Sequence, residues 1–241
     1  MPADQANQHV ATALAHLNGG RFAEAAAAAR AALQIRADQP DAIHILGLAA
    51  WRTGKLAEAA QLISATIALV PGYAEAHRNL GLVLRDLGQP GKAIACFRRA
   101  TELQPTMADA HFHLATLLRE KGDVEAAVAI YQRVLALSPN HPPALNDLGA
   151  VLKDRGRIAD AIEYFRRALA AFPNYAVALI NLAGALMDRG DPTAARELYA
   201  RALELAPSSP MRASAIACRS SPSAMRARPR SRRAAPRIRA N

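Results

Sequence analysis

Glycine recurs at a spacing of 34 residues along most of this chain, and no other feature limits its fold as strongly. Six of the 13 glycines keep this spacing: Gly20, Gly54, Gly88, Gly122, Gly156 and Gly190. An alanine follows five residues after each glycine, at Ala25, Ala59, Ala93, Ala127, Ala161 and Ala195. Such a period is typical of repeat architectures, in which each unit buries its apolar face against its neighbours. The sequence therefore predicts a stack of similar units.

Each unit is expected to form two helices separated by its glycine. The stretches on both sides of the glycine place apolar residues at the helical period of 3.6. The glycine lies just past the first stretch, where a helix C-terminus favours a left-handed residue. A proline then follows the second stretch in most units and prevents its helix from continuing. These prolines are Pro71, Pro105, Pro139, Pro173 and Pro207.

Small and large residues alternate in a way that predicts close packing of the two helices. The first stretch carries a small residue at Ala13, Gly47, Gly81, Ala115, Gly149 and Ala183. The second stretch carries a large one at Ile63, Phe97, Tyr131, Phe165 and Tyr199. We expect the small residues to let the helix axes approach and the large ones to fill the space beside them.

Aromatic residues are only 5% of the chain, which argues against a β-sandwich.

The pattern resembles the tetratricopeptide repeat (TPR). The resemblance covers six units without insertion: 6–39, 40–73, 74–107, 108–141, 142–175 and 176–209. It implies an all-α, right-handed superhelical solenoid of helix-turn-helix repeats with a concave inner groove, preceded by a lead-in at 1–5. The first unit departs most from the pattern, with Thr12, Ala29 and Ala37 at the leucine, large and proline positions. Such weak terminal copies are expected to act as caps.

A change of composition follows the sixth unit. Ser209 and Pro210 suit a helix start, so a capping helix is expected over 210–219. Residues 220–241 are predicted to be a disordered basic tail. The chain has a net charge of +10, and residues 210–241 hold nine arginines and no acidic residue. Three interpretations stay open for this stretch: a passive tail, a weak nucleic-acid binder, or an out-of-frame translation.

No constellation of residues indicates an enzyme. His111 and His113 point to different faces of a helix, and no phosphate-binding glycine loop or hydrolase motif is present. Cys96 and Cys218 do not have metal-ligand spacing. We therefore expect no catalytic activity, no cofactor and no metal. The polar N-terminus and the absence of a long apolar run predict a cytoplasmic protein without a membrane span.

The concave groove is the candidate binding site. In TPR proteins the first helix of each pair lines it, and positions 2, 5, 6, 9, 12 and 13 of each unit face it. The sequence around Asn79 resembles the TPR arm of O-linked N-acetylglucosamine transferases, where an asparagine ladder grips an extended peptide. Asn79 and Asn181 would be rungs of this ladder, or simply tolerated polar residues. The candidate peptide-binding residues are Arg78, Asn79, Phe112, His113, Asn146, Asp147, Asn181, Arg85, Arg119 and Lys153.

A second row of repeated side chains belongs to the second helices. It consists of Arg99, Arg133, Arg167 and Arg201. Glu163 and Glu197 lie four residues before the last two, a spacing that favours ion pairs along a helix. We expect this row to be a solvated ridge on the convex face.

These observations predict a non-catalytic interaction scaffold that binds an extended peptide or a partner helix, of unspecified identity, in its groove. One alternative is a targeting arm of a truncated or frameshifted glycosyltransferase or sulfotransferase. A second alternative is weak nucleic-acid binding through the basic tail.

Overall fold

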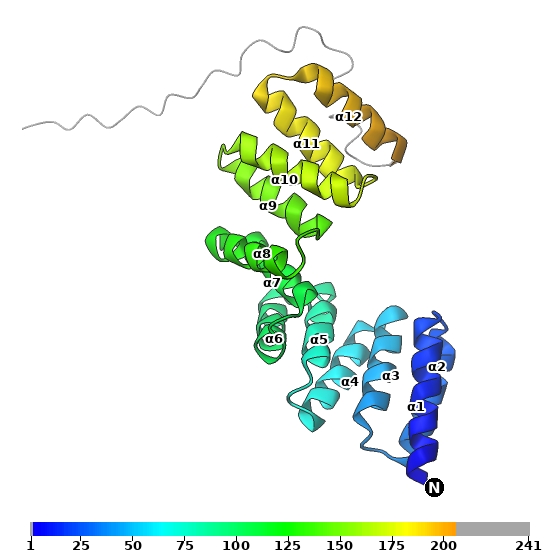
Figure 1. Cartoon of the computed structure of the whole chain (residues 1–241). Coiled ribbons are helices and arrows are strands. Elements are labelled where there is room, and N and C mark those ends of the chain that lie inside the picture. Colours follow the sequence, from blue (N-terminus) through cyan, green and yellow to red (C-terminus); the bar gives the residue numbers. More distant parts are fainter. Residues whose placement is uncertain (1, 206–241) are drawn as a thin grey trace, which may run out of the picture.

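The computed structural model describes residues 2–205, which form twelve α-helices and no β-strand (Figure 1). The helices are α1 (Pro2–Asn18), α2 (Phe22–Ile35), α3 (Pro40–Arg52), α4 (Leu56–Leu69), α5 (Ala74–Asp86), α6 (Pro90–Leu103), α7 (Ala108–Lys121), α8 (Val124–Leu137), α9 (Pro142–Asp154), α10 (Ile158–Ala171), α11 (Ala176–Arg189) and α12 (Pro192–Leu205). Each predicted unit contains one pair. We call the odd-numbered helices A and the even-numbered helices B.

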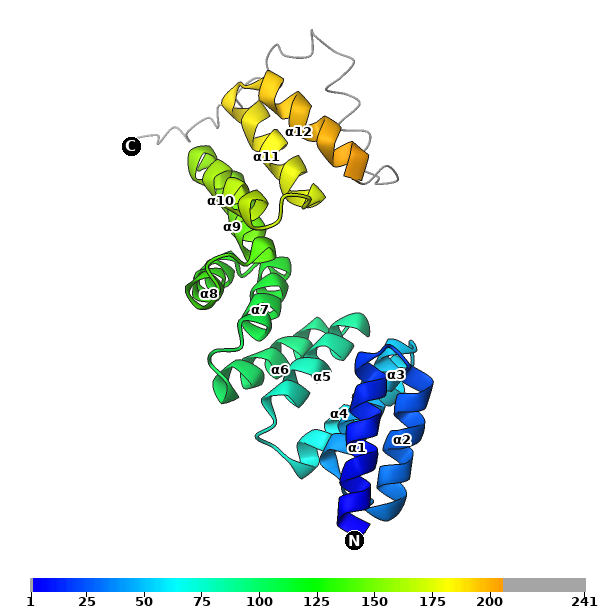
Figure 2. The same cartoon turned by 45° about the vertical axis from the view of Figure 1, so that its right-hand side comes forward.

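The six pairs stack in chain order. Each helix packs against the next, and helix A of one repeat also touches helix A of the following repeat, as α1 touches α3 and α9 touches α11. Figures 1 and 2 show the pairs turning progressively from α1 at one end to α12 at the other. The predicted all-α superhelix of helix pairs is therefore confirmed.

The repeated glycines end the A helices as predicted. All six have positive φ, between 70° and 92°. Gly122 at φ 92° is the C-terminal cap of α7, and its N–H donates to backbone carbonyls of the last helical turn. A residue with a Cβ is strained in this left-handed conformation, which explains why glycine keeps the position.

The core confirms close packing within the pairs. All six alanines at the fixed B-helix position are completely buried. A Cβ added at Gly149 would lie 2.7 Å from Cε1 of Phe165, and one at Gly81 would lie 2.9 Å from Phe97. Phe97 and Phe165 are themselves completely buried. The small residue on helix A and the large residue on helix B therefore occupy one shared space.

Helix α1 begins at Pro2, so it includes most of the predicted lead-in at residues 1–5. No glycine or further proline interrupts residues 3–18, and Asp4 lies in the first turn, where a negative charge favours a helix. The predicted capping helix at 210–219 and the tail at 220–241 lie outside the described residues. None of the helices between residues 2 and 205 is long and apolar enough to cross a membrane.

Candidate functional site

Neighbouring A helices are joined by polar side chains at a spacing of 35 residues. The amide Nδ2 of Asn79 lies 3.0 Å from Nε2 of His44. Nδ2 of Asn181 donates to Oδ1 of Asn146 over 2.9 Å. In both cases position 6 of one unit meets position 5 of the unit before it. The two predicted ladder asparagines are therefore anchored in the same way, to the preceding repeat.

This anchoring buries part of the candidate site. Asn79 is 5% exposed and Asn146 is 3% exposed, whereas Asn181 is only partly buried. A side-chain amide carries two N–H donors and a carbonyl acceptor. Asn79 donates one N–H to His44, and Asn181 donates one N–H to Asn146. In each amide, the carbonyl oxygen and the second N–H have no partner among the described residues.

His44 takes part in this contact as a neutral ring. It is 4% exposed and packs edge-on against Tyr73, with ring centroids 5.0 Å apart. Burial lowers the pKa of His44 below its ordinary value of 6.5. A neutral ring can accept the Asn79 N–H at Nε2, which a protonated ring cannot.

The fourth repeat contributes an aromatic cluster around Phe112. Its ring centroid lies 5.5 Å from that of His113, 6.1 Å from that of Tyr131 and 5.0 Å from that of His141. Burial, followed by the charge of Arg85, lowers the pKa of His113 to about 4. The cluster is therefore uncharged at neutral pH, and it joins α7 to α8 and to the start of α9.

Asp147 is the polar centre of the fifth repeat. Its carboxylate accepts hydrogen bonds from the Tyr131 hydroxyl at 3.1 Å and from Asn146 Nδ2 at 3.2 Å. The Arg119 guanidinium lies 3.9 Å away. Burial, and next the Asp147 charge, raise the pKa of Tyr131 to about 12, so its hydroxyl remains a donor. Asp147 thus ties together three helices, α7, α8 and α9.

The charged residues at positions 12 and 13 also pair across or within repeats. Lys153 lies 3.5 Å from Asp188 of the following repeat. Arg85 lies 3.0 Å from Asp86, its neighbour in sequence. Asp86 in turn accepts a hydrogen bond of 2.8 Å from the indole N–H of Trp51. Exposed pairs of this kind contribute little to stability, about 0–1 kcal/mol each.

A hollow of about 520 Å³ opens among the A helices of the first three repeats. It is lined by Leu17, Asn18, Gly20, Phe22, Leu48, Trp51, Arg52, Arg78, Asn79 and Leu82. Only Arg78 and Asn79 of these were predicted as site residues. Trp51 is the single tryptophan of the chain and stands at groove position 12, so the sequence carried a signal for it. The leucines carried none, because they resemble core positions.

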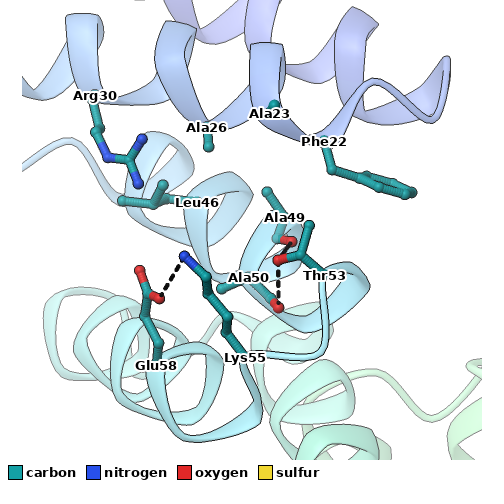
Figure 3. A pocket seen from close by; sticks show the side chains of 10 residues that line it. All are labelled: Phe22, Ala23, Ala26, Arg30, Leu46, Ala49, Ala50, Thr53, Lys55 and Glu58. Atoms are coloured by element: carbon teal, nitrogen blue, oxygen red, sulfur yellow. Dashed lines mark hydrogen bonds and ion pairs between the residues drawn. The ribbon is translucent and has the colours of Figure 1, made fainter.

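A second hollow of about 240 Å³ lies between α2, α3 and the start of α4 (Figure 3). Its walls are mostly apolar and include Phe22, Ala26 and Leu46, while Lys55 and Glu58 face each other 3.7 Å apart at one side. Helix α2 is rich in alanine, and its short side chains leave this space open.

The arginine row on the B helices is exposed, as predicted, but it also joins repeats. Arg167 donates to the carbonyl oxygen of Pro139 at 3.3 Å, and Arg201 to that of Pro173 at 2.9 Å. The expected pair with Glu163 does not form, because the Arg167 guanidinium reaches back to the preceding loop.

The described residues do not gather a metal site, and the thiol of Cys96 is not activated. Between residues 2 and 205, no three His, Cys, Asp or Glu side chains gather where they would hold a metal ion. Cys96 is partly buried, and burial raises the pKa of its thiol, which lowers the fraction of reactive thiolate.

Comparison with solved structures identifies several TPR proteins with a similar fold. PilF of Pseudomonas aeruginosa is 18% identical, with a TM-score of 0.79 over 86% of this chain and 95% of that chain. PilW, a type IV pilus biogenesis factor, is 22% identical, with a TM-score of 0.76 over 88% and 98%. YrrB, a TPR protein with an unusual peptide-binding site, is 19% identical, with a TM-score of 0.65 over 80% and 98%. These similarities establish the fold alone.

Comparison with curated proteins gives no match. A family model for the tetratricopeptide repeat matches residues 44–94, 78–142 and 146–210, which together span more than half of the chain. The helix pairs, the left-handed glycines and this match agree, and the chain belongs to the tetratricopeptide repeat family.

Proposed function

We propose that this chain is a protein-interaction scaffold that binds an extended peptide or a partner helix on the surface of its A helices. The observation that carries the proposal is the 520 Å³ hollow, which A helices of three consecutive repeats line with both apolar and hydrogen-bonding side chains. Ligand sites combine these two kinds of lining, since apolar area supplies affinity and polar groups fix orientation.

The anchored asparagines support an extended peptide as the ligand. The contacts of Asn79 to His44 and of Asn181 to Asn146 hold each amide in one orientation before any ligand arrives. An amide held in this way loses less conformational freedom on binding. Its remaining carbonyl oxygen and N–H suit the alternating donors and acceptors of a peptide backbone.

The description of YrrB as a TPR protein with a peptide-binding site is consistent with this proposal. A cytoplasmic location and the absence of catalysis stay predictions. The two alternatives, a targeting arm of a transferase and nucleic-acid binding through the tail, stay predictions as well, because both depend on the stretch after residue 205.

Photocrosslinking tests the proposal. The full chain would be incubated with a random library of peptides that carry a diazirine amino acid, and the crosslinked residues would be mapped by mass spectrometry. We expect crosslinks on helices A, mainly α3, α5, α7, α9 and α11. Crosslinks confined to helices B, or no bound peptide, would overturn the proposal.

Asn181→Ala is the cleanest variant for this assay. Asn181 is partly exposed, so its removal disturbs the fold less than the removal of the buried Asn79. One lost hydrogen bond of about 0.5–1.5 kcal/mol corresponds to a several-fold loss of affinity. Arg99→Gln on helix α6 is the control, and it should leave binding unchanged.

A further inference from the structure

We propose that the hollow among α1, α3 and α5 selects peptides in which an acidic side chain stands next to a large apolar one. This inference rests on the proposed function and names its ligand class. The acidic group would meet Arg52 and Arg78, and the apolar one would lie against Trp51 and the leucines of the same hollow.

The charge of the hollow is uncompensated. No carboxylate is among its lining residues. Within residues 2–205, neither Arg52 nor Arg78 has a carboxylate partner within ion-pair distance. Three other cations of the candidate site are paired: Arg85 with Asp86, Arg119 with Asp147 and Lys153 with Asp188.

Arg52 is arranged to receive a carboxylate beside the ring of Trp51. The Trp51 indole N–H is fixed by Asp86 at 2.8 Å, and the Arg52 guanidinium lies over the indole ring, 5.3 Å from its centroid. Stacking on an aromatic ring leaves the N–H groups at the edge of the guanidinium available, and these bind carboxylates in a two-bonded geometry. Arg78 enters the same hollow from the next A helix, so two positive charges converge there.

The proposed ligand also needs a large apolar side chain, because part of the lining of the hollow is apolar. Leu17, Leu48 and Leu82 come from three successive A helices and meet in one hollow. Leu48 and Leu17 are partly exposed, so this surface is accessible to a ligand. Covering it with a leucine or phenylalanine removes apolar area from water, which is worth about 25 cal/mol for each Å².

The basic end of the chain is the wrong occupant for this hollow. Residues 210–241 carry nine arginines and no acidic residue, so the two guanidiniums would repel them. Charge complementarity therefore favours a segment of another protein.

The test uses the full chain and pools of hexapeptides that are acetylated and amidated, so that side chains supply all carboxylates. One position is Glu, Gln or Lys, its neighbour is Leu, Phe or Ser, and the other positions are random. Binding is measured by fluorescence anisotropy. We expect pools with Glu beside Leu or Phe to bind about tenfold more tightly than the matched Gln pools, as charge-assisted hydrogen bonds require.

The double variant R52Q/R78Q should abolish the preference for Glu over Gln. R98Q/R99Q removes the same charge from the exposed outer face of α6 and should keep the preference. Equal binding of Glu and Gln pools by the natural chain overturns the inference while peptide binding itself survives. Failure of every pool to bind overturns both this inference and the proposed function. The comparison of Glu and Gln pools on the natural chain does not depend on the folding of any variant.

Discussion

The contact between Gly149 and Phe165 predicts that a single methyl group will destabilise the fifth repeat. A Cβ at position 149 would lie 2.7 Å from Cε1 and 2.9 Å from Cδ1 of a ring that is completely buried. Overpacking of this kind costs about 1–3 kcal/mol. Alanine also has a helix propensity about 1 kcal/mol better than glycine, so Gly149→Ala should lower the free energy of unfolding by about 0–2 kcal/mol.

Gly184→Ala supplies a matched control in another A helix. Its added Cβ would meet Lys153 Nζ at 3.2 Å and the Tyr199 hydroxyl at 3.7 Å. The lysine end is flexible and can move, so the gain in helix propensity, about 1 kcal/mol, should dominate. The two variants should therefore differ by about 1–3 kcal/mol although the chemical change is identical.

Urea unfolding followed by circular dichroism measures this difference. Stacked repeats share stability with their neighbours, so the midpoint and slope of all three chains are compared together. The reasoning is refuted if Gly149→Ala is as stable as Gly184→Ala, because the close approach of α9 and α10 would then have no energetic consequence.

Three further predictions follow from single contacts. Because the pKa of His113 is lowered to about 4 in the folded chain, the unfolded chain binds more protons than the folded one between pH 6.5 and 4. The free energy of unfolding should therefore fall as the pH falls through this window. Urea unfolding of the natural chain and of His113→Gln at pH 7 and pH 5 should show a smaller loss of this free energy in the variant. Asn79→Ala should cost about 1–3 kcal/mol, since it leaves the buried His44 Nε2 without a donor, and thermal unfolding measures this loss. Gly122→Ala should lower the free energy of unfolding by about 1–2 kcal/mol, because Gly122 has a φ of 92°. An added Cβ meets nothing within 4 Å at Gly122 or at Gly91, but Gly91 does not have a positive φ, so Gly91→Ala should not destabilise the chain. A loss of equal size in both variants would contradict the role of the left-handed turn.

The helix pairs could be predicted from the sequence because their determinants repeat. Gly122 ends α7 for a reason that lies within its own turn, and Gly149 faces Phe165 within one helix pair. Both relations involve residues close in sequence, and each occurs in several units. A determinant that is local and recurs in this way is visible as a spacing of 34 residues.

The contacts between repeats could not be predicted in the same way. Asn79 meets His44, and Asn181 meets Asn146, one residue away from the repeat period. The chemistry at these two positions changes from unit to unit, so no single pair of residue types recurs. The sequence predicts that Asn79 and Asn181 face the groove, but it does not name their partners, which depend on how far adjacent A helices are offset.

Arg167 shows why long polar side chains are the least predictable part of such a protein. Its spacing from Glu163 favours an ion pair on one helix face, yet an exposed pair is worth only about 0.3–0.5 kcal/mol. The alternative partner, the carbonyl of Pro139, belongs to the loop of the preceding repeat and accepts its N–H at 3.3 Å. Two weak partners of similar energy compete, and the stacking of repeats decides between them by placing the carbonyl within reach. Stacking of the repeats also decides which charges meet in the hollow at α3 and α5. It brings Arg52 and Arg78 into one lining without a carboxylate, and this unpaired positive charge is what an acidic ligand can recognise.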